Sequence, residues 1–163
     1  MFPEFKTTNI RGKLEVARDR LRVYEDVLTR DPTSRMIESA HTDIADAINY
    51  TVDGFLMVMG KDRGQYRNNL EALGAAYPYV DAAVQQSLPA LESLQAILEH
   101  FPTETKLGSI IIARASSVHE YGKVIYTPQE TAQEAYDQVF AFWAGAVIAT
   151  QRVPGLNLGL ELE

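Results

Sequence analysis

The segment Ser34–Gly60, with the sequence SRMIESAHTDIADAINYTVDGFLMVMG, decides the predicted fold because it reads as one long amphipathic helix. At about 100° per residue, one face of this helix is apolar. That face carries Ile37, Ile44, Ile48, Phe55 and Met59. Asp43, Asp46 and Asp53 lie on the opposite side, and we expect this acidic row to face solvent. His41 lies within the apolar arc, which predicts a buried, hydrogen-bonded core histidine.

Helical spacing of apolar residues extends from this segment in both directions. It predicts further helices over residues 11–30, 65–76, 79–101, 104–121 and 127–152. Gly60 and Pro78 are placed to end helices, and Pro89 predicts a kink or two short helices. The last helix starts with a capping box, Thr127-Pro128-Gln129-Glu130. Residues 123–126 are β-prone, and the isoleucine triplet at 110–112 fits either a helix or a strand.

These patterns predict an all-α, single-domain bundle of five to six helices with room for one short β element. We expect an extended N-terminal arm over residues 1–10, a helical domain over 11–152 and an extended C-terminal arm over 153–163. A chain of 163 residues is long enough to bury a sizeable core in one domain.

Charge and composition weigh against several classes of protein. The formal net charge is −7, and the densest basic group, Arg18, Arg20 and Arg22, is interleaved with acids, so we expect no nucleic-acid binding. The chain has no cysteine, and so no disulfide or thiolate metal site. The N-terminus has no signal-peptide pattern, and the longest apolar run, Val139–Ala149, is shorter than the roughly 20 residues that span a bilayer. We expect no membrane association and a cytoplasmic location, or a place in a particle assembled there.

Two kinds of metal chemistry fit the long helix. Glu38 and His41 form a Glu-x-x-His pair, the spacing of di-iron and di-manganese helix bundles, but no second pair exists in this chain. Such a site needs a carboxylate from a neighbouring helix, for which Glu15 and Glu25 are candidates. A Glu38/His41 metal-binding bundle is therefore one alternative.

The stretch Asp43-Ile-Ala-Asp46-Ala-Ile-Asn-Tyr resembles the Glu-x-x-Asp helix of the all-α nucleoside triphosphate pyrophosphohydrolases. That family holds Mg²⁺ with four acids on successive helices, in one Glu-x-x-Glu and one Glu-x-x-Asp motif. The resemblance covers residues 43–50 and departs from the pattern twice: Asp43 replaces Glu, and the earlier helix has Arg22-x-x-Glu25. It implies a Mg²⁺ site built from Asp43 and Asp46 with Glu25 and Glu38.

Other features point to association. The segment Val139–Ala149 is apolar on every face, so it is either the central helix or part of an oligomer interface anchored by Phe142 and Trp143. Both arms carry hydrophobic residues, which disordered tails usually lack. They either pack on their own domain or reach neighbouring subunits, the C-terminal arm by strand addition. The arm residues concerned are Phe2, Phe5, Leu156, Leu158, Leu160 and Leu162.

The leading hypothesis is a non-enzymatic structural or adaptor protein that forms homo-oligomers or binds a protein partner, with no catalytic residues and no cofactor. Small assembly components, including those of viral particles, share this general build. The alternatives are the Mg²⁺-dependent pyrophosphohydrolase and the Glu-x-x-His metal protein. The final Leu-Glu is either native or a cloning remnant.

Overall fold

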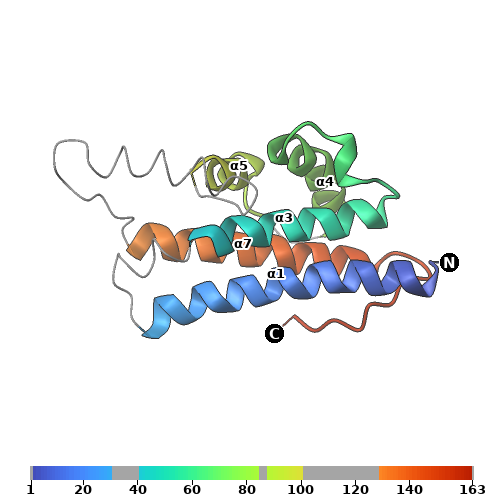
Figure 1. Ribbon diagram of the computed structural model, residues 1–163, viewed down its shortest axis with the longest axis horizontal. Coiled ribbons are helices and arrows are strands. Elements are labelled where there is room, and N and C mark those ends of the chain that lie inside the picture. The colour runs from blue at the N-terminus through green and yellow to red at the C-terminus, as the bar shows by residue number, and fades with distance from the viewer. Residues whose placement is uncertain (1, 31–40, 85–87, 101–128, 163) are drawn as a thin grey trace.

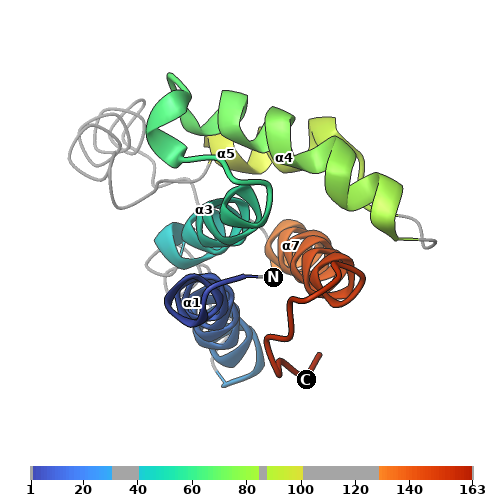
Figure 2. The ribbon, with the colours of Figure 1, turned by 90° about the vertical axis from the view of Figure 1, so that its right-hand side faces the viewer.

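The computed structural model describes residues 2–30, 41–84, 88–100 and 129–162, and within these ranges the chain is all-α. Three long helices lie side by side, and two shorter helices cover them on one side (Figures 1 and 2). The long helices are α1 (Glu4–Arg30), α3 (His41–Val58) and α7 (Gln129–Gln151), and the covering helices are α4 (Asn69–Ala83) and α5 (Leu91–His100). A 3₁₀ turn, η1 (Arg63–Gln65), lies between α3 and α4. The predicted all-α bundle is confirmed.

The core forms where α1, α3 and α7 meet. The apolar stripe predicted on the first helix is fully buried apart from its last residue, which is 5 % exposed, and the stripe extends one turn further, to Ile10. Its residues are Ile10, Leu14, Ala17, Leu21, Tyr24 and Leu28. The helix that is apolar all round, α7, contacts each of the other four described helices, as expected of a central helix.

The first helix begins earlier than predicted. The carbonyl of Pro3 accepts the N–H groups of Lys6 and Thr7 at 3.1 and 3.0 Å, so the helix starts at Glu4 and the extended arm over residues 1–10 is wrong. Threonine is a weak helix former, which is why this segment reads as an arm in the sequence. Burial of Ile10 on the shared core face explains the longer helix, since packing overrides a weak local preference.

The end of α3 is the one predicted. Gly60 has a φ of +72°, and its N–H bonds the Met57 carbonyl while the Lys61 N–H bonds the Leu56 carbonyl at 2.8 Å. This is a Schellman cap, which favours glycine because other residues are strained at positive φ.

The prolines divide the middle of the chain differently from the prediction. Pro78 lies inside α4 and does not end it. The missing N–H of an interior proline costs about 3 kcal/mol. The residues around it are anchored: Val80 is fully buried, and the Tyr77 hydroxyl donates to the Pro89 carbonyl at 2.7 Å. Tertiary contacts on both sides of Pro78 thus offset the lost helical bond. Beyond Pro89, α5 forms a separate helix. Of the two predicted forms, a kinked helix or two short helices, the second is therefore the one observed.

Several predictions lie outside the described residues. They are the start of the second helix, the helix over 104–121, the β-prone residues 123–126 and the first half of the capping box at residue 127. Among the described helices, none combines the length and the apolar character that a bilayer span requires.

Candidate functional site

The C-terminal segment, residues 153–162, runs back past α1 and α7 (Figure 2). Its residues line pockets together with side chains of both helices, and we call this docking position the α1–α7 groove. The chain turns back after α7 at Gly155, whose φ is +78°, and continues without regular secondary structure. Leu156 and Leu158 are 6 % and 5 % exposed and belong to the hydrophobic core. The alternation seen in the sequence therefore places these leucines in the core of their own chain.

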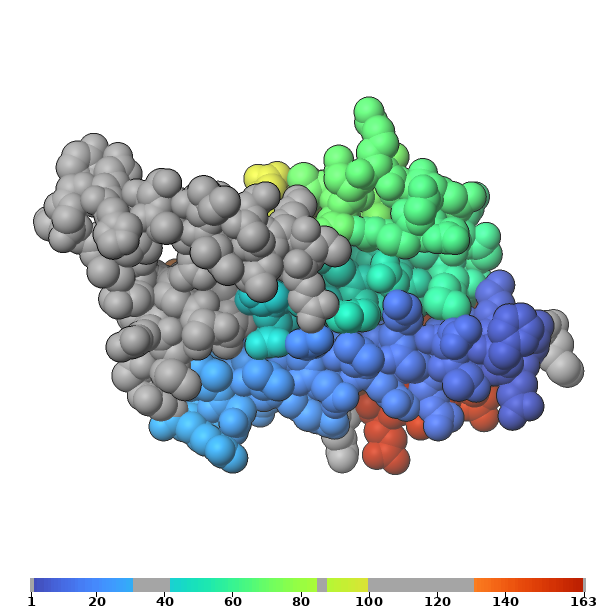
Figure 3. All heavy atoms as spheres, viewed as in Figure 1, coloured from blue at the N-terminus to red at the C-terminus, as the bar shows by residue number. Residues whose placement is uncertain are grey.

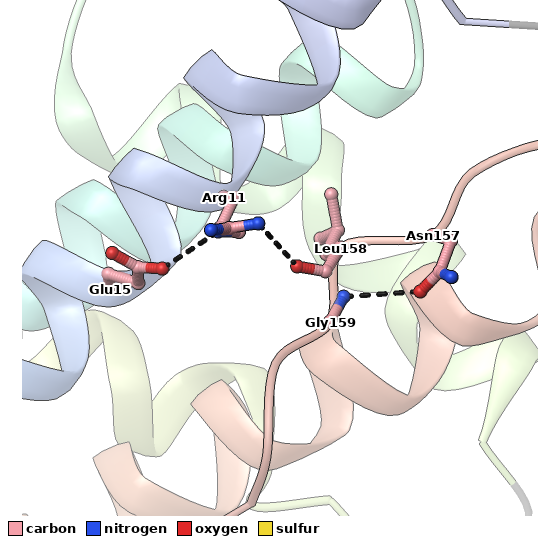
Figure 4. Close-up of polar contacts among 5 residues, drawn as sticks. All are labelled: Arg11, Glu15, Asn157, Leu158 and Gly159. Atoms are coloured by element: carbon pink, nitrogen blue, oxygen red, sulfur yellow. Dashed lines mark hydrogen bonds and ion pairs between the residues drawn. The ribbon is translucent and has the colours of Figure 1, made fainter.

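Few polar contacts hold this segment (Figure 4). Arg11 donates from Nη1 to the Leu158 carbonyl at 3.4 Å and from Nε to Glu15 at 3.0 Å. The Asn157 side chain accepts the Gly159 N–H at 3.2 Å, which closes a local turn at a φ of +65°. The bond from Arg11 is long, whereas two leucines of the segment are buried in the core, so apolar burial contributes to holding the segment.

The two aromatic residues proposed as interface anchors lie in the core. Phe142 is fully buried and its ring stacks on Tyr77 at 6.4 Å between centroids. Trp143 is 1 % exposed, and its indole N–H donates to the Leu14 carbonyl at 2.8 Å, which ties α7 to α1. In this conformation neither ring is accessible to a partner.

The remaining arm residues differ in exposure. Phe2 and Leu160 are partly buried against the core, whereas Phe5 and Leu162 are 71 % and 39 % exposed. Tyr79 on α4, which the sequence analysis did not single out, is 59 % exposed. Val23, in the middle of α1, is 49 % exposed, so the accessible large apolar side chains are spread over the two termini, α1 and α4.

The acidic row of α3 does not face solvent, contrary to the prediction. Asp46 is only 4 % exposed, and the side chains of Asp43 and Asp53 are 18 % and 22 % exposed. Arg20 of α1 forms an ion pair with Asp43 at 3.3 Å. Asp46 is therefore buried and Asp43 is half-buried beside a cation of α1, in surroundings where an isolated carboxylate would be costly.

The residues of the two metal hypotheses are only partly within the described chain. Glu38 and the side chain of His41 lie outside it. Glu25 accepts a short hydrogen bond from the Tyr136 hydroxyl of α7, whereas Asp43 is paired with α1. No three metal-ligating side chains gather within the described residues. Glu25 therefore contributes to the α1–α7 contact, and the described acids offer no support for a metal site.

The Tyr136 hydroxyl has a perturbed ionisation. Burial, reinforced by its bond to the Glu25 carboxylate, raises the pKa of Tyr136 to about 12. The ring stacks on Phe140 at 6.0 Å, and the guanidinium of Arg18 lies 5.0 Å from the centroid of the Phe140 ring. The stacked pair lies on α7, and the cation–π contact from Arg18 and the bond to Glu25 join it to α1.

Sequence reasoning missed a basic pocket of about 470 Å³. It lies where the first turns of α1 meet the end of α3 and the turn that follows. Its cations come from two segments that are far apart in the sequence, so no local motif reveals it: Lys6 and Lys13 of α1, and Lys61 and Arg63 of the turn after α3. The one sequence signal was the run Gly60-Lys-Asp-Arg-Gly64, which lacks the spacing of a phosphate-binding loop.

Comparison with protein-family models, with curated proteins and with solved structures finds no match to this chain. The described residues define an all-α bundle, and any function must be argued from its own surfaces.

Proposed function

We propose that this protein is a non-enzymatic helical adaptor that self-associates by exchanging its C-terminal segment between copies. The observation that carries the proposal is the way the segment is seated: residues 153–162 follow a glycine turn and dock through alternate leucines into the α1–α7 groove. In an exchanged pair, the same segment fills the same groove of a neighbouring copy.

The modest free energy that docks the C-terminal segment permits its exchange between copies. Burying one leucine side chain contributes roughly 1.5–3 kcal/mol, so Leu156 and Leu158 together contribute about 3–6 kcal/mol at most. That is enough to keep the segment docked, yet small enough for occasional release without unfolding the bundle. Closed and exchanged forms make the same groove contacts, so their balance depends on protein concentration and on the turn at Gly155.

The proposal differs from the arm exchange expected from sequence in one respect. The N-terminal residues are the first turns of α1, so the exchangeable element is the C-terminal segment alone. Exposed Phe5 and Tyr79 offer further contact points for a protein partner, as isolated apolar side chains and not as one patch.

Crosslinking between differently labelled copies tests the exchange. Because the chain has no cysteine, Glu15→Cys in one protein and Glu161→Cys in another introduce unique thiols. Both residues are exposed and line the same groove. After mixing and treatment with a short bis-maleimide, we expect a covalent heterodimer whose yield rises with concentration, because the thiols meet only when one copy's segment seats on another.

The matched control pairs Glu161→Cys with Arg67→Cys, whose side chain is 89 % exposed just before α4. A heterodimer yield no greater than this control, together with a monomer mass at every concentration in light scattering, would sink the proposal. A third protein carries both Glu15→Cys and Glu161→Cys. If this protein forms a crosslink within one chain and the mixed single variants form none, the segment stays in its own groove.

A further inference from the structure

The basic pocket is a built feature that the adaptor function does not use. Phe5, Lys6, Asn9 and Lys13 of α1 form one wall, and the opposite wall includes Asp53 of α3. Figure 3 shows the dark blue first turns of α1 against the green segment that follows α3. The volume of about 470 Å³ is within the range of small-molecule sites.

The pocket concentrates positive charge in an acidic protein. It has four cationic side chains against the carboxylates of Asp53 and Asp62, while the whole chain has a net charge of −7. The Asp62 carboxylate is already engaged, since it accepts the Gly64 N–H at 2.9 Å as the cap of η1. Such a local excess focuses the potential in a concave site and attracts anions.

Three of these cations form no close ion pair in the described part of the chain, although Lys13 lies near enough to Asp53 to lower the pKa of its carboxyl. Within the described residues, the ammonium groups of Lys6, Lys13 and Lys61 form no ion pair. The Lys6 and Lys13 ammonium groups instead lie 5.4 Å from the ring centroids of Phe2 and Tyr50. Rings hold these groups in place without neutralising them, so they are available to an anion.

The fourth cation, Arg63, has a guanidinium nitrogen without a hydrogen-bond partner. Arg63 Nη1 lies 3.7 Å from Asp53 Oδ1, too far for a hydrogen bond, and both atoms are buried without a hydrogen-bond partner. Burial raises the pKa of the Asp53 carboxyl, and the nearby Arg63 and Lys13 lower it in part. The Arg63 side chain is 28 % exposed overall, so its remaining N–H groups can donate to a ligand anion.

From these contacts we propose that the pocket binds the phosphate group of a small phosphorylated organic molecule. A phosphate monoester carries up to two negative charges and three terminal oxygens, which suits a pocket lined by several cations better than a single carboxylate does. The volume exceeds that of one phosphate ion, and the walls include the apolar side chains of Phe5 and Met57. These walls suit an uncharged organic part. The inference does not depend on the exchange of the C-terminal segment.

Calorimetric titration with glycerol 3-phosphate, ribose 5-phosphate and adenosine 5′-monophosphate tests the proposal against inorganic phosphate and adenosine. At least one phosphomonoester is expected to bind more tightly than inorganic phosphate, and adenosine is expected not to bind. In NMR titrations, the amide signal of Gly60, which lines the pocket, and that of Gly64, which donates to the lining residue Asp62, report on the pocket. The amide signal of Gly74 in α4 serves as the reference.

Two variants test the site, and a third is their control. Arg63→Ala and the exposed-turn variant Lys61→Glu should each weaken phosphomonoester binding by about tenfold or more, the effect of losing one charged contact. Arg67→Ala removes an exposed cation paired with Glu71 and should leave binding unchanged. Circular dichroism and melting temperature establish that each variant is folded.

The outcomes separate clearly. Absence of binding by every phosphate compound overturns the proposal, as does equal weakening by the Arg67→Ala control. If inorganic phosphate binds as tightly as each monoester, the claim that the pocket also recognises the organic part of the ligand is overturned. If Arg63→Ala fails to fold, Lys61→Glu decides, because the backbone N–H of Lys61 that completes the α3 cap is retained.

Discussion

The substitution Gly155→Ala should shift the protein from monomer towards dimer. Gly155 has a φ of +78° at the turn that sends the C-terminal segment back along its own bundle. An alanine at positive φ costs roughly 1–2 kcal/mol. An exchanged dimer opens two such turns and relieves both strains, so it gains about 2–4 kcal/mol relative to two closed monomers. The association constant should therefore rise about 30-fold to about 700-fold.

Sedimentation equilibrium over a range of concentrations measures this shift. The matched control is Gly159→Ala, because Gly159 also has a positive φ, +65°, but lies in the seated part of the segment. Its strain is the same in closed and exchanged forms, so it should lower the melting temperature without changing association. The reasoning is refuted if Gly155→Ala leaves the mass unchanged while lowering the melting temperature by about 2–4 °C per kcal/mol of strain. An equal mass shift in both variants would also refute it.

Three further predictions concern the bundle itself. A Cβ at Gly54 would lie 3.2 Å from an atom of α1, whereas nothing lies within 4 Å of a Cβ at Gly12. In urea unfolding, Gly12→Ala should therefore stabilise the protein by about 0.5–1 kcal/mol, and Gly54→Ala should be about 1–3 kcal/mol less stable than that control. Equal values for the two variants would contradict the close contact between α1 and α3. Because burial raises the pKa of Asp53, the folded state holds its proton to higher pH than the unfolded state, whose value is about 3.9. The stability of the wild type relative to Asp53→Asn should therefore fall as pH rises from about 4 to 7, and a flat difference would argue against a raised pKa. Tyr136→Phe removes the hydroxyl that donates to Glu25 and should lower the free energy of thermal unfolding by about 1–3 kcal/mol. It should also remove the tyrosine that titrates near pH 12 from the alkaline absorbance titration. An unchanged titration would show that the raised pKa belongs to another tyrosine.

Local patterning predicted much of the fold. The stripe on α1, the glycine that ends α3 and the apolar character of α7 each depend on residues close together in the sequence. These features appear in the structure because they are set by helix periodicity and by the conformational freedom of glycine. The start of α1 and the continuation of α4 through Pro78 were not predicted, since contacts with distant residues outweigh the local preferences there.

The candidate sites were less predictable. A helical wheel for residues 41–58 separates polar from apolar side chains, but it cannot show that α1 brings Arg20 against Asp43. In the same way, the alternating leucines of the C-terminal segment indicate one apolar face without indicating which groove receives it. The basic pocket joins Lys6, Lys13 and Arg63 from parts of the chain that only the bundle brings together.

The amphipathic pattern of residues 34–60, with its counterparts along the chain, thus determined by itself that this protein is an all-α bundle. The periodicity of apolar side chains is a local property that a single segment carries. Only the tertiary structure decided that Asp46 is buried and that Asp43 pairs with Arg20 of α1. It also decided that Leu156 and Leu158 join the core of their own chain and that four cations line one pocket. Each of these depends on which helix faces which, and that choice follows from the packing of the whole core.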